Sequence, residues 1–179
     1  MPKVSADVKA GWAYAEAVVH GDIIAGKWCI RSCERALHDR EHAESRGYYF
    51  DKKTARNVLR FFPEMLRHAK GGDPFLLEPF QAFMISQVYG WKSIETGFRR
   101  FRTGYQKIGR KNGKSSLLAG IGLHAVYTGP EGAEIFCGAT KRDQAMKVVE
   151  PAIVMASKSP DIDQITVHQR KNDWLVNTD

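Results

Sequence analysis

The chain has 179 residues, of which 43% are hydrophobic, so it is long enough for one domain with a real core and too short for two of ordinary size. Its 27 basic against 20 acidic residues give a net charge of +7, which favours phosphates as partners, in a nucleic acid or a nucleotide, although a basic domain without such a partner has the same composition. No segment approaches the roughly 18 apolar residues of a membrane span, and the N-terminus lacks the apolar core of a signal peptide. The three cysteines do not have the spacing of a disulfide framework, which suits a reducing cytoplasm.

Residues 1–72 form a region that the spacing of apolar residues predicts to be helical. Ser5 is expected to cap a first helix, a second helix is expected over about residues 23–43, and Asp51 is expected to cap a third. The segment 71–74 (GGDP) should end the third helix and divide this region from residues 73–179.

Residues 73–179 alternate between helical and strand-like patterns. The predicted helices are residues 79–88, residues 114–127, and a helix capped by Thr140 that runs toward Lys158 with Pro151 as a kink or break. The predicted strands are residues 98–108, 134–138, 164–169 and 174–177, the last two around a turn at residues 171–173. This alternation predicts an α/β fold with a parallel sheet, preceded by the helical N-terminal subregion.

The central motif is the stretch 109–116 (GRKNGKSS), which lies between a predicted strand and a predicted helix, where a phosphate-binding loop (P-loop) belongs. Gly113 lets the backbone turn its N–H groups around an anion, and the helix that starts near Lys114 directs the positive end of its dipole to the same point. Lys114 can reach the β- and γ-phosphates of ATP, and Ser115 can offer its hydroxyl to Mg²⁺. The predicted ATP and Mg²⁺ site comprises Asn112, Gly113, Lys114, Ser115 and Ser116.

The motif also admits an alternative. The general pattern G-x-x-x-x-G-K-[ST] puts its first glycine at Ile108, and the nearest glycine is Gly109. Asn112 and Gly113 together are a strong type I′ hairpin turn. A hairpin needs a strand after the turn, whereas residues 114–120 contain no β-branched residue and several helix formers. The P-loop is therefore the preferred interpretation and the hairpin the alternative.

The loop resembles the variant Walker A motif of the terminase large subunits of tailed bacteriophages, in which a basic residue, here Arg110, takes the place of the usual first glycine. Upstream, residues 77–81 (LEPFQ) and 89–91 (YGW) resemble the adenine-recognition segment of that family, with Gln81 as the glutamine that binds the adenine edge.

The resemblance extends on both sides of these motifs. Residues 135–145 (IFCGATKRDQA) resemble the strand and helix that follow the loop in this family, and residues 14–21 and 33–35 resemble its N-terminal helices. It therefore covers nearly the whole chain. It implies an N-terminal ATPase that moves double-stranded DNA into a procapsid, and an endonuclease domain expected only in the full-length protein.

The same resemblance implies the partners and the catalytic residues. The partners are double-stranded DNA, the portal, the small terminase subunit and further copies of the chain in a ring, with no membrane, in the cytoplasm of the bacterial host. Lys114 and Arg110 would be the catalytic residues, neutralising charge on the transferred phosphoryl group, with Mg²⁺ held by Ser115.

One element of the family pattern is not found. After the P-loop the family carries a Walker B strand that ends in Asp-Glu, and the nearest candidate here, residues 174–179 (WLVNTD), lacks the glutamate. The expectation is an incomplete ATPase domain, a fragment that binds nucleotide and hydrolyses it poorly or not at all.

Three further patterns are assigned ordinary structural roles. Residues 98–102 (FRRFR) interleave arginines with aromatic residues, which is typical of a nucleic-acid patch but is explained more simply by a half-exposed strand. Arg142 is a surface residue in the preferred interpretation and a trans-acting arginine finger in the alternative. Cys29, Cys33, His38 and His42 invite a zinc interpretation, but one continuous helix would spread them around its circumference.

Two other functions remain open at this point. The chain could belong to another P-loop ATPase, such as a helicase-like enzyme. It could also be a non-catalytic module that binds DNA or a partner and carries a vestigial loop, which predicts no nucleotide affinity and steeply salt-dependent DNA binding.

Overall fold

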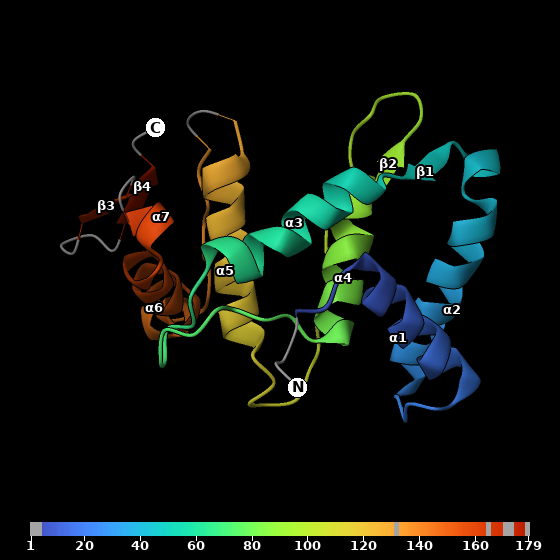
Figure 1. Ribbon diagram of the computed structural model, residues 1–179, viewed down its shortest axis with the longest axis horizontal. Coiled ribbons are helices and arrows are strands. Elements are labelled where there is room, and N and C mark those ends of the chain that lie inside the picture. Colours follow the sequence, from blue (N-terminus) through green and yellow to red (C-terminus); the bar gives the residue numbers. More distant parts are fainter. Residues whose placement is uncertain (1–4, 131–132, 164–165, 170–173, 178–179) are drawn as a thin grey trace. The chain divides into compact units, whose positions relative to one another are not determined.

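A computed structural model describes residues 5–130, 133–163, 166–169 and 174–177 of the chain. The chain forms two compact units that are interleaved in sequence: residues 1–60 with 76–106, and residues 61–75 with 107–179. The boundary expected between residues 72 and 73 remains a prediction. Figure 1 shows the helices and strands of each unit in chain order.

Three helices build the core of the first unit: α1 (Val8–His20), α2 (Lys27–His42) and α4 (Pro79–Gly90). The cap of α1 is Asp7, whose carboxylate accepts the N–H of Ala10 at 2.8 Å. The prediction that Ser5 caps this helix was wrong, because its hydroxyl accepts the N–H of Leu77 at 3.0 Å instead. The apolar cluster between the helices contains Ala15, Val18, Cys33, Ala36 and Phe83.

A glycine sets how closely α1 approaches α4. A Cβ added at Gly11 would lie 2.9 Å from the backbone nitrogen of Phe83. No real Cβ tolerates that distance to backbone, so the two helices pack together only because position 11 carries no side chain.

A short antiparallel ladder joins β1 (Tyr48–Phe50), which follows the 3-10 turn η1 (Glu44–Arg46), to β2 (Trp91–Ser93). Phe50 lies opposite Trp91, with the two rings edge to face at 5.2 Å. Helix α3 (Lys52–Met65) follows β1 in the chain, with one residue between them. Asp51 caps it as predicted, because its carboxylate accepts the N–H of Thr54 at 2.9 Å.

A buried carboxylate gathers three arginines in the first unit. The side chain of Asp39 on α2 is fully buried and forms ion pairs with Arg35, Arg46 and Arg100. The guanidinium of Arg100 also lies over the ring of Phe101 at 4.8 Å. The arginines thus tie α2, η1 and the segment after β2 to one negative charge.

The second unit contains the end of α3, then α5 (Lys114–Thr128), α6 (Arg142–Lys158), α7 (Pro160–Asp163), β3 (Thr166–Gln169) and β4 (Trp174–Asn177). Gly120 of α5 lies against the ring of Phe62, where an added Cβ would approach a ring carbon to 2.5 Å. Helix α6 continues through Pro151, which therefore does not break it. Thr140 is not the cap of α6, because its hydroxyl bonds to the side chain of Gln144 while Lys141 holds the cap position.

The strands that the structure describes pair only in antiparallel ladders, β1 with β2 and β3 with β4. Residues 98–108 and 134–138 form no strand, apart from a single antiparallel bridge between Lys92 and Arg99. A strand is stable only when a neighbouring strand accepts and donates its backbone hydrogen bonds. In a parallel sheet that neighbour comes from a distant part of the chain, so a strand-like composition alone does not produce the strand. The turn predicted at residues 171–173 lies outside the described residues.

Candidate functional site

The site is built around the start of α5 in the second unit. Gly113 adopts a left-handed conformation, with φ of 68°, and is the N-cap residue of the helix. Its carbonyl accepts the N–H of Leu117 at 2.8 Å, the first hydrogen bond of the helix. A helix, not a strand, follows the turn, so the hairpin alternative for Asn112 and Gly113 is wrong.

The first turn of α5 offers backbone donors to an anion. The N–H groups of Lys114, Ser115 and Ser116 precede the first carbonyl partner that a helix provides, and no side chain caps them at Gly113. The positive end of the helix dipole lies at the same point. The structure thus brings together Asn112, Gly113, Lys114, Ser115 and Ser116, five of the predicted site residues, in an arrangement suited to phosphate.

The side chain of Lys114 folds back over the loop. Its Nζ donates a hydrogen bond to the backbone carbonyl of Ile108 at 3.1 Å, and the residue is half-buried. The ammonium group therefore lies on the loop side of the helix start. This position fits the role predicted for the lysine.

The loop is braced by Asn112. Its Nδ2 lies 3.4 Å from the carbonyl oxygen of Gly109 and 3.2 Å from that of Arg110, and donates to both. Lys111 takes a left-handed conformation with φ of 66°, which no other non-glycine residue in the described part of the chain adopts. Such strain concentrates at ligand-binding loops.

Two of these loop features were missed in the sequence. The carbonyl of Ile108 and the strained backbone of Lys111 belong to residues whose side chains carry no recognisable signal. Arg110 is exposed at the edge of the loop, and its catalytic role stays a prediction.

Gln81 lies in the first unit, in the first turn of α4. Its Oε1 accepts the N–H of Glu78 at 2.9 Å, and the Glu78 carboxylate accepts the N–H of Gln81, which completes a capping box. Only 6% of Gln81 is exposed. The carboxamide is thus held in one orientation, with Oε1 already accepting one hydrogen bond.

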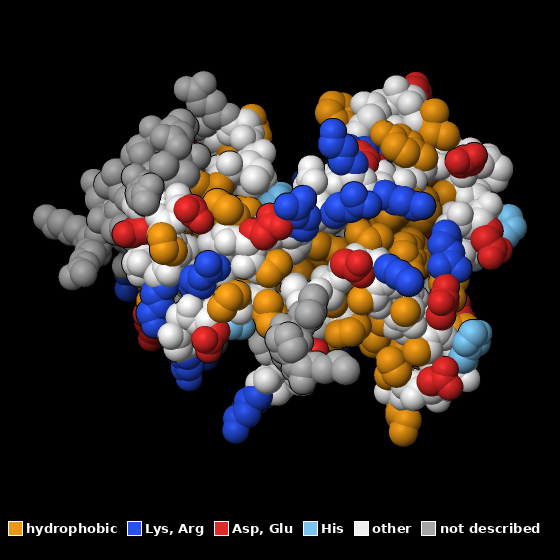
Figure 2. Space-filling model, viewed as in Figure 1, with side chains coloured by type: hydrophobic (Ala, Val, Ile, Leu, Met, Phe, Trp, Pro, Cys, Tyr) orange, Lys and Arg blue, Asp and Glu red, His pale blue; other side chains and the backbone are white. Residues whose placement is uncertain are grey.

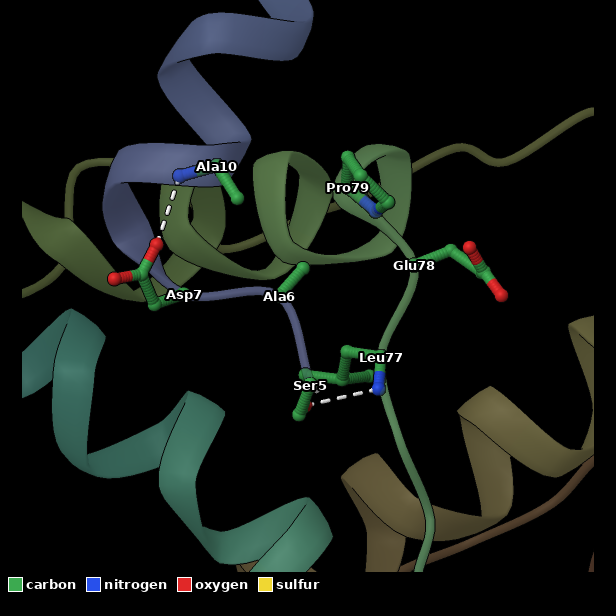
Figure 3. A pocket seen from close by; sticks show the side chains of 7 residues that line it. All are labelled: Ser5, Ala6, Asp7, Ala10, Leu77, Glu78 and Pro79. Atoms are coloured by element: carbon green, nitrogen blue, oxygen red, sulfur yellow. Dashed lines mark hydrogen bonds between the residues drawn. The ribbon is translucent and has the colours of Figure 1, made fainter. Parts of the chain in front are cut away.

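A cavity of about 460 Å³ opens beside the start of α4. Figure 3 shows Leu77, Glu78 and Pro79 on one side and the segment from Ser5 to Ala10 on the other, with the Glu78 side chain directed away from Asp7. The hydrogen bond from Leu77 to Ser5 joins the two walls. Residues 77–79 of the predicted adenine-recognition segment therefore border a cavity, and the contact of Gln81 with a base stays a prediction.

The residues considered for zinc lie along the single helix α2. Burial, with Cys29 beside it, raises the pKa of the Cys33 thiol to about 12, so this thiol is neutral at pH 7, whereas zinc binds the thiolate. Within the described part of the chain, no group of three or more His, Cys, Asp and Glu side chains is placed to hold a metal ion. No helix among the described residues is both long and apolar enough to cross a membrane.

Arg142 is exposed as the first residue of α6, and its role as an arginine finger stays a prediction. The segment considered for Walker B contains β4, which pairs antiparallel with β3, and its last residue, Asp179, lies outside the described residues.

Comparison with known proteins places the loop in a defined context. A family model described as the ATPase domain of the terminase large subunit matches residues 79–178, more than half of the chain. The chain is also 37% identical over 97 residues to the terminase large subunit of Enterobacteria phage HK97. That match covers 52% of this chain and 18% of the relative's length. No solved structure matches.

Proposed function

The chain belongs to the terminase large subunit family, within its ATPase domain, and on that basis we propose that the start of α5 binds the phosphates of ATP. The observation that carries the proposal is the geometry at Gly113. A left-handed glycine opens a helix whose first N–H groups meet no side-chain cap, and the Lys114 ammonium lies over the same loop.

The residues present fit a magnesium nucleotide. Backbone N–H groups and Lys114 would hold the phosphates, and the hydroxyl of Ser115, in the first turn of α5, would be a ligand of Mg²⁺. Bound Mg²⁺ would supply charge neutralisation at the phosphates. Arg110, exposed at the loop edge, would reach the terminal phosphate and stabilise charge there. Gln81 would bind the adenine edge, since a carboxamide can donate and accept at once.

In the full-length protein we propose that ATP hydrolysis drives double-stranded DNA into a procapsid. The portal, the small terminase subunit and further copies of the chain in a ring would be its partners, and an endonuclease domain would cut the DNA. The HK97 relative is named as a terminase large subunit, and the match spans 18% of its length, so these activities belong to a longer protein than the matched segment.

We propose that the predicted strands at residues 98–108 and 134–138 are neighbouring and parallel in the complete ATPase domain. They flank α5 in sequence, as strands flank the crossover helix of a βαβ unit. Ile135 of the second segment lies against α5, with its side chain 3.8 Å from the position that a Cβ on Gly122 would take.

Calorimetric titration of Mg-ATP into the chain tests the proposal. Lys114→Ala removes a charged hydrogen-bond donor, worth about 1.5–3 kcal/mol, so affinity should fall about 10- to 100-fold. The matched control is Lys107→Ala, which removes an exposed lysine just before the loop and should leave affinity unchanged.

Two results would contradict the proposal. Equal affinities for Lys114→Ala and Lys107→Ala would show that the loop lysine is not at the phosphates. Absence of ATP binding by a folded sample, with DNA binding retained, would favour a non-catalytic module instead.

A further inference from the structure

One face of helix α3 is basic. Lys52, Lys53, Arg56 and Arg60 are exposed on it, and Ala55, Val58 and Leu59 on the opposite face are buried. Figure 2 shows the basic side chains following one another along α3. We call these four residues the α3 basic face. All of them lie in the first unit.

The charge of three of these side chains is not neutralised within the described part of the chain. Lys52, Lys53 and Arg56 form no ion pair there. The nearest carboxylate in sequence, Asp51, is engaged by the Nζ of Lys92 at 2.7 Å. The charge is therefore available to a partner.

The two lysines are placed against the helix dipole. No acidic residue lies in the first turn of α3, which instead carries Lys52 and Lys53 at its positive end. Like charges at this end destabilise a helix, and an anion bound there reverses the effect. The carboxylate of Asp51, which caps the helix and pairs with Lys92, already meets this end of the dipole, so the two exposed lysines contribute no stabilisation to the start of the helix.

The other basic run, at residues 98–102, is engaged by the fold. Arg100 is ion-paired with the buried Asp39 at 2.8 Å, and the guanidinium of Arg99 lies 4.9 Å from the ring centroid of Tyr89. These arginines pack against their own unit, so this run does not offer a continuous cationic surface.

We propose that the α3 basic face binds the phosphate backbone of double-stranded DNA. At a rise of 1.5 Å per residue, its charges extend over about 12 Å of helix, along a duplex that carries one negative charge per roughly 1.7 Å. Lysine and arginine bind phosphates without reading sequence, and the exposed amide of Asn57 adds a further donor. The proposal rests on the proposed function only in taking DNA as the partner.

The test is fluorescence anisotropy of a labelled generic duplex, titrated with the chain at several KCl concentrations. The variant Lys52→Gln/Lys53→Gln/Arg56→Gln removes three charges. The matched control, Lys9→Gln/Lys27→Gln/Arg31→Gln, removes three exposed charges from α1 and α2 of the same unit. A third variant, Lys52→Arg/Lys53→Arg/Arg56→Lys, keeps every charge.

The α3 variant should bind at least tenfold more weakly at low salt, and its slope of log affinity against log salt should be smaller by about 2.7, or 0.9 per lost phosphate contact. The control should lose less than one unit of slope, and the charge-keeping variant should bind like the wild type. Circular dichroism of each variant separates loss of binding from loss of the helix.

Equal losses in the α3 variant and the control would overturn the proposal, since net charge alone would explain them. Equally tight binding of polyglutamate, lost in the same variant, would assign the surface to an acidic protein instead. Mg-ATP titration of the α3 variant should match the wild type. If the wild type binds ATP but not DNA, the DNA-binding proposal for the α3 basic face is refuted and the proposed ATP site is not. The result for Lys114→Ala, in contrast, tests only the proposed ATP site.

Discussion

Replacing Asp39 by asparagine removes the negative charge from a fully buried side chain that forms ion pairs with three arginines. Arg100 depends on this charge most, because its side chain is only 16% exposed and its Nη1 lies 2.8 Å from the carboxylate. Arg35 is 42% exposed and its Nη1 lies 3.3 Å away, so water screens its charge and its share is small.

The size of the effect follows from this asymmetry. Removing one partner of a buried ion pair costs about 3–5 kcal/mol, because the other charge is left uncompensated. Asparagine keeps one acceptor oxygen, and two of the three arginines reach solvent, so we expect the lower limit of about 3 kcal/mol. That is a large part of the 5–15 kcal/mol that stabilises an ordinary domain.

Urea denaturation followed by circular dichroism measures the loss. With a slope of about 2 kcal/mol per molar, the midpoint should fall by about 1.5 M with the slope unchanged. Glu16→Gln is the matched control, because it breaks the exposed ion pair of Glu16 with Arg40 at 2.8 Å and should cost less than about 1 kcal/mol. Equal midpoint shifts for the two variants would refute the reasoning.

Two more predictions concern single hydrogen-bonded side chains. Hydrogen bonds from Lys92 and Thr54 lower the pKa of Asp51 below its ordinary value of 3.8. Because the pKa is lower in the folded state, the ionised carboxylate stabilises the fold fully above about pH 4, and this contribution is lost as the pH falls toward the folded pKa. The advantage of the wild type over Asp51→Asn, about 1–2 kcal/mol, should thus be constant from pH 5 to 8 in urea denaturation and shrink below pH 4, and a constant difference down to pH 2 would contradict it. Gln81→Ala should cost about 1 kcal/mol of stability through the capping box. In calorimetry it should weaken Mg-ATP binding about 3- to 10-fold and leave the binding of inorganic tripolyphosphate unchanged, whereas Lys114→Ala should weaken the binding of both ligands. Losses of equal size for the two ligands in Gln81→Ala would contradict a contact with the base.

Features specified by neighbouring residues were predictable from the sequence. The helix predicted over residues 79–88 is Pro79–Gly90, and the one predicted over residues 114–127 is Lys114–Thr128. Both begin at local signals, a proline in the first turn and a glycine cap. The choice between a helix and a hairpin after Gly113 was local as well, because the helix formers at residues 114–120 decided it.

Features that depend on distant residues were not predictable in this way. Ser5 has the chemistry of a cap, but its hydroxyl accepts a hydrogen bond from Leu77, 72 positions away. Asp39 lies in a stretch of charged residues typical of an exposed helix face, yet it is fully buried, because Arg46 and Arg100 come to it from other segments. Neither partner can be inferred from the periodicity of one helix.

The contrast between the loop and the sheet has the same origin. The helix that starts at Gly113 is closed by a local hydrogen bond, from the N–H of Leu117 to the carbonyl of Gly113, so the arrangement of N–H groups suited to phosphate forms from residues within one turn. A parallel strand must draw its hydrogen bonds from a neighbour beyond a crossover helix, and residues 134–138 carry the composition of a buried strand without a ladder to join. The motif therefore predicts the turn and the helix start, which form from neighbouring residues, more securely than the sheet that would support them.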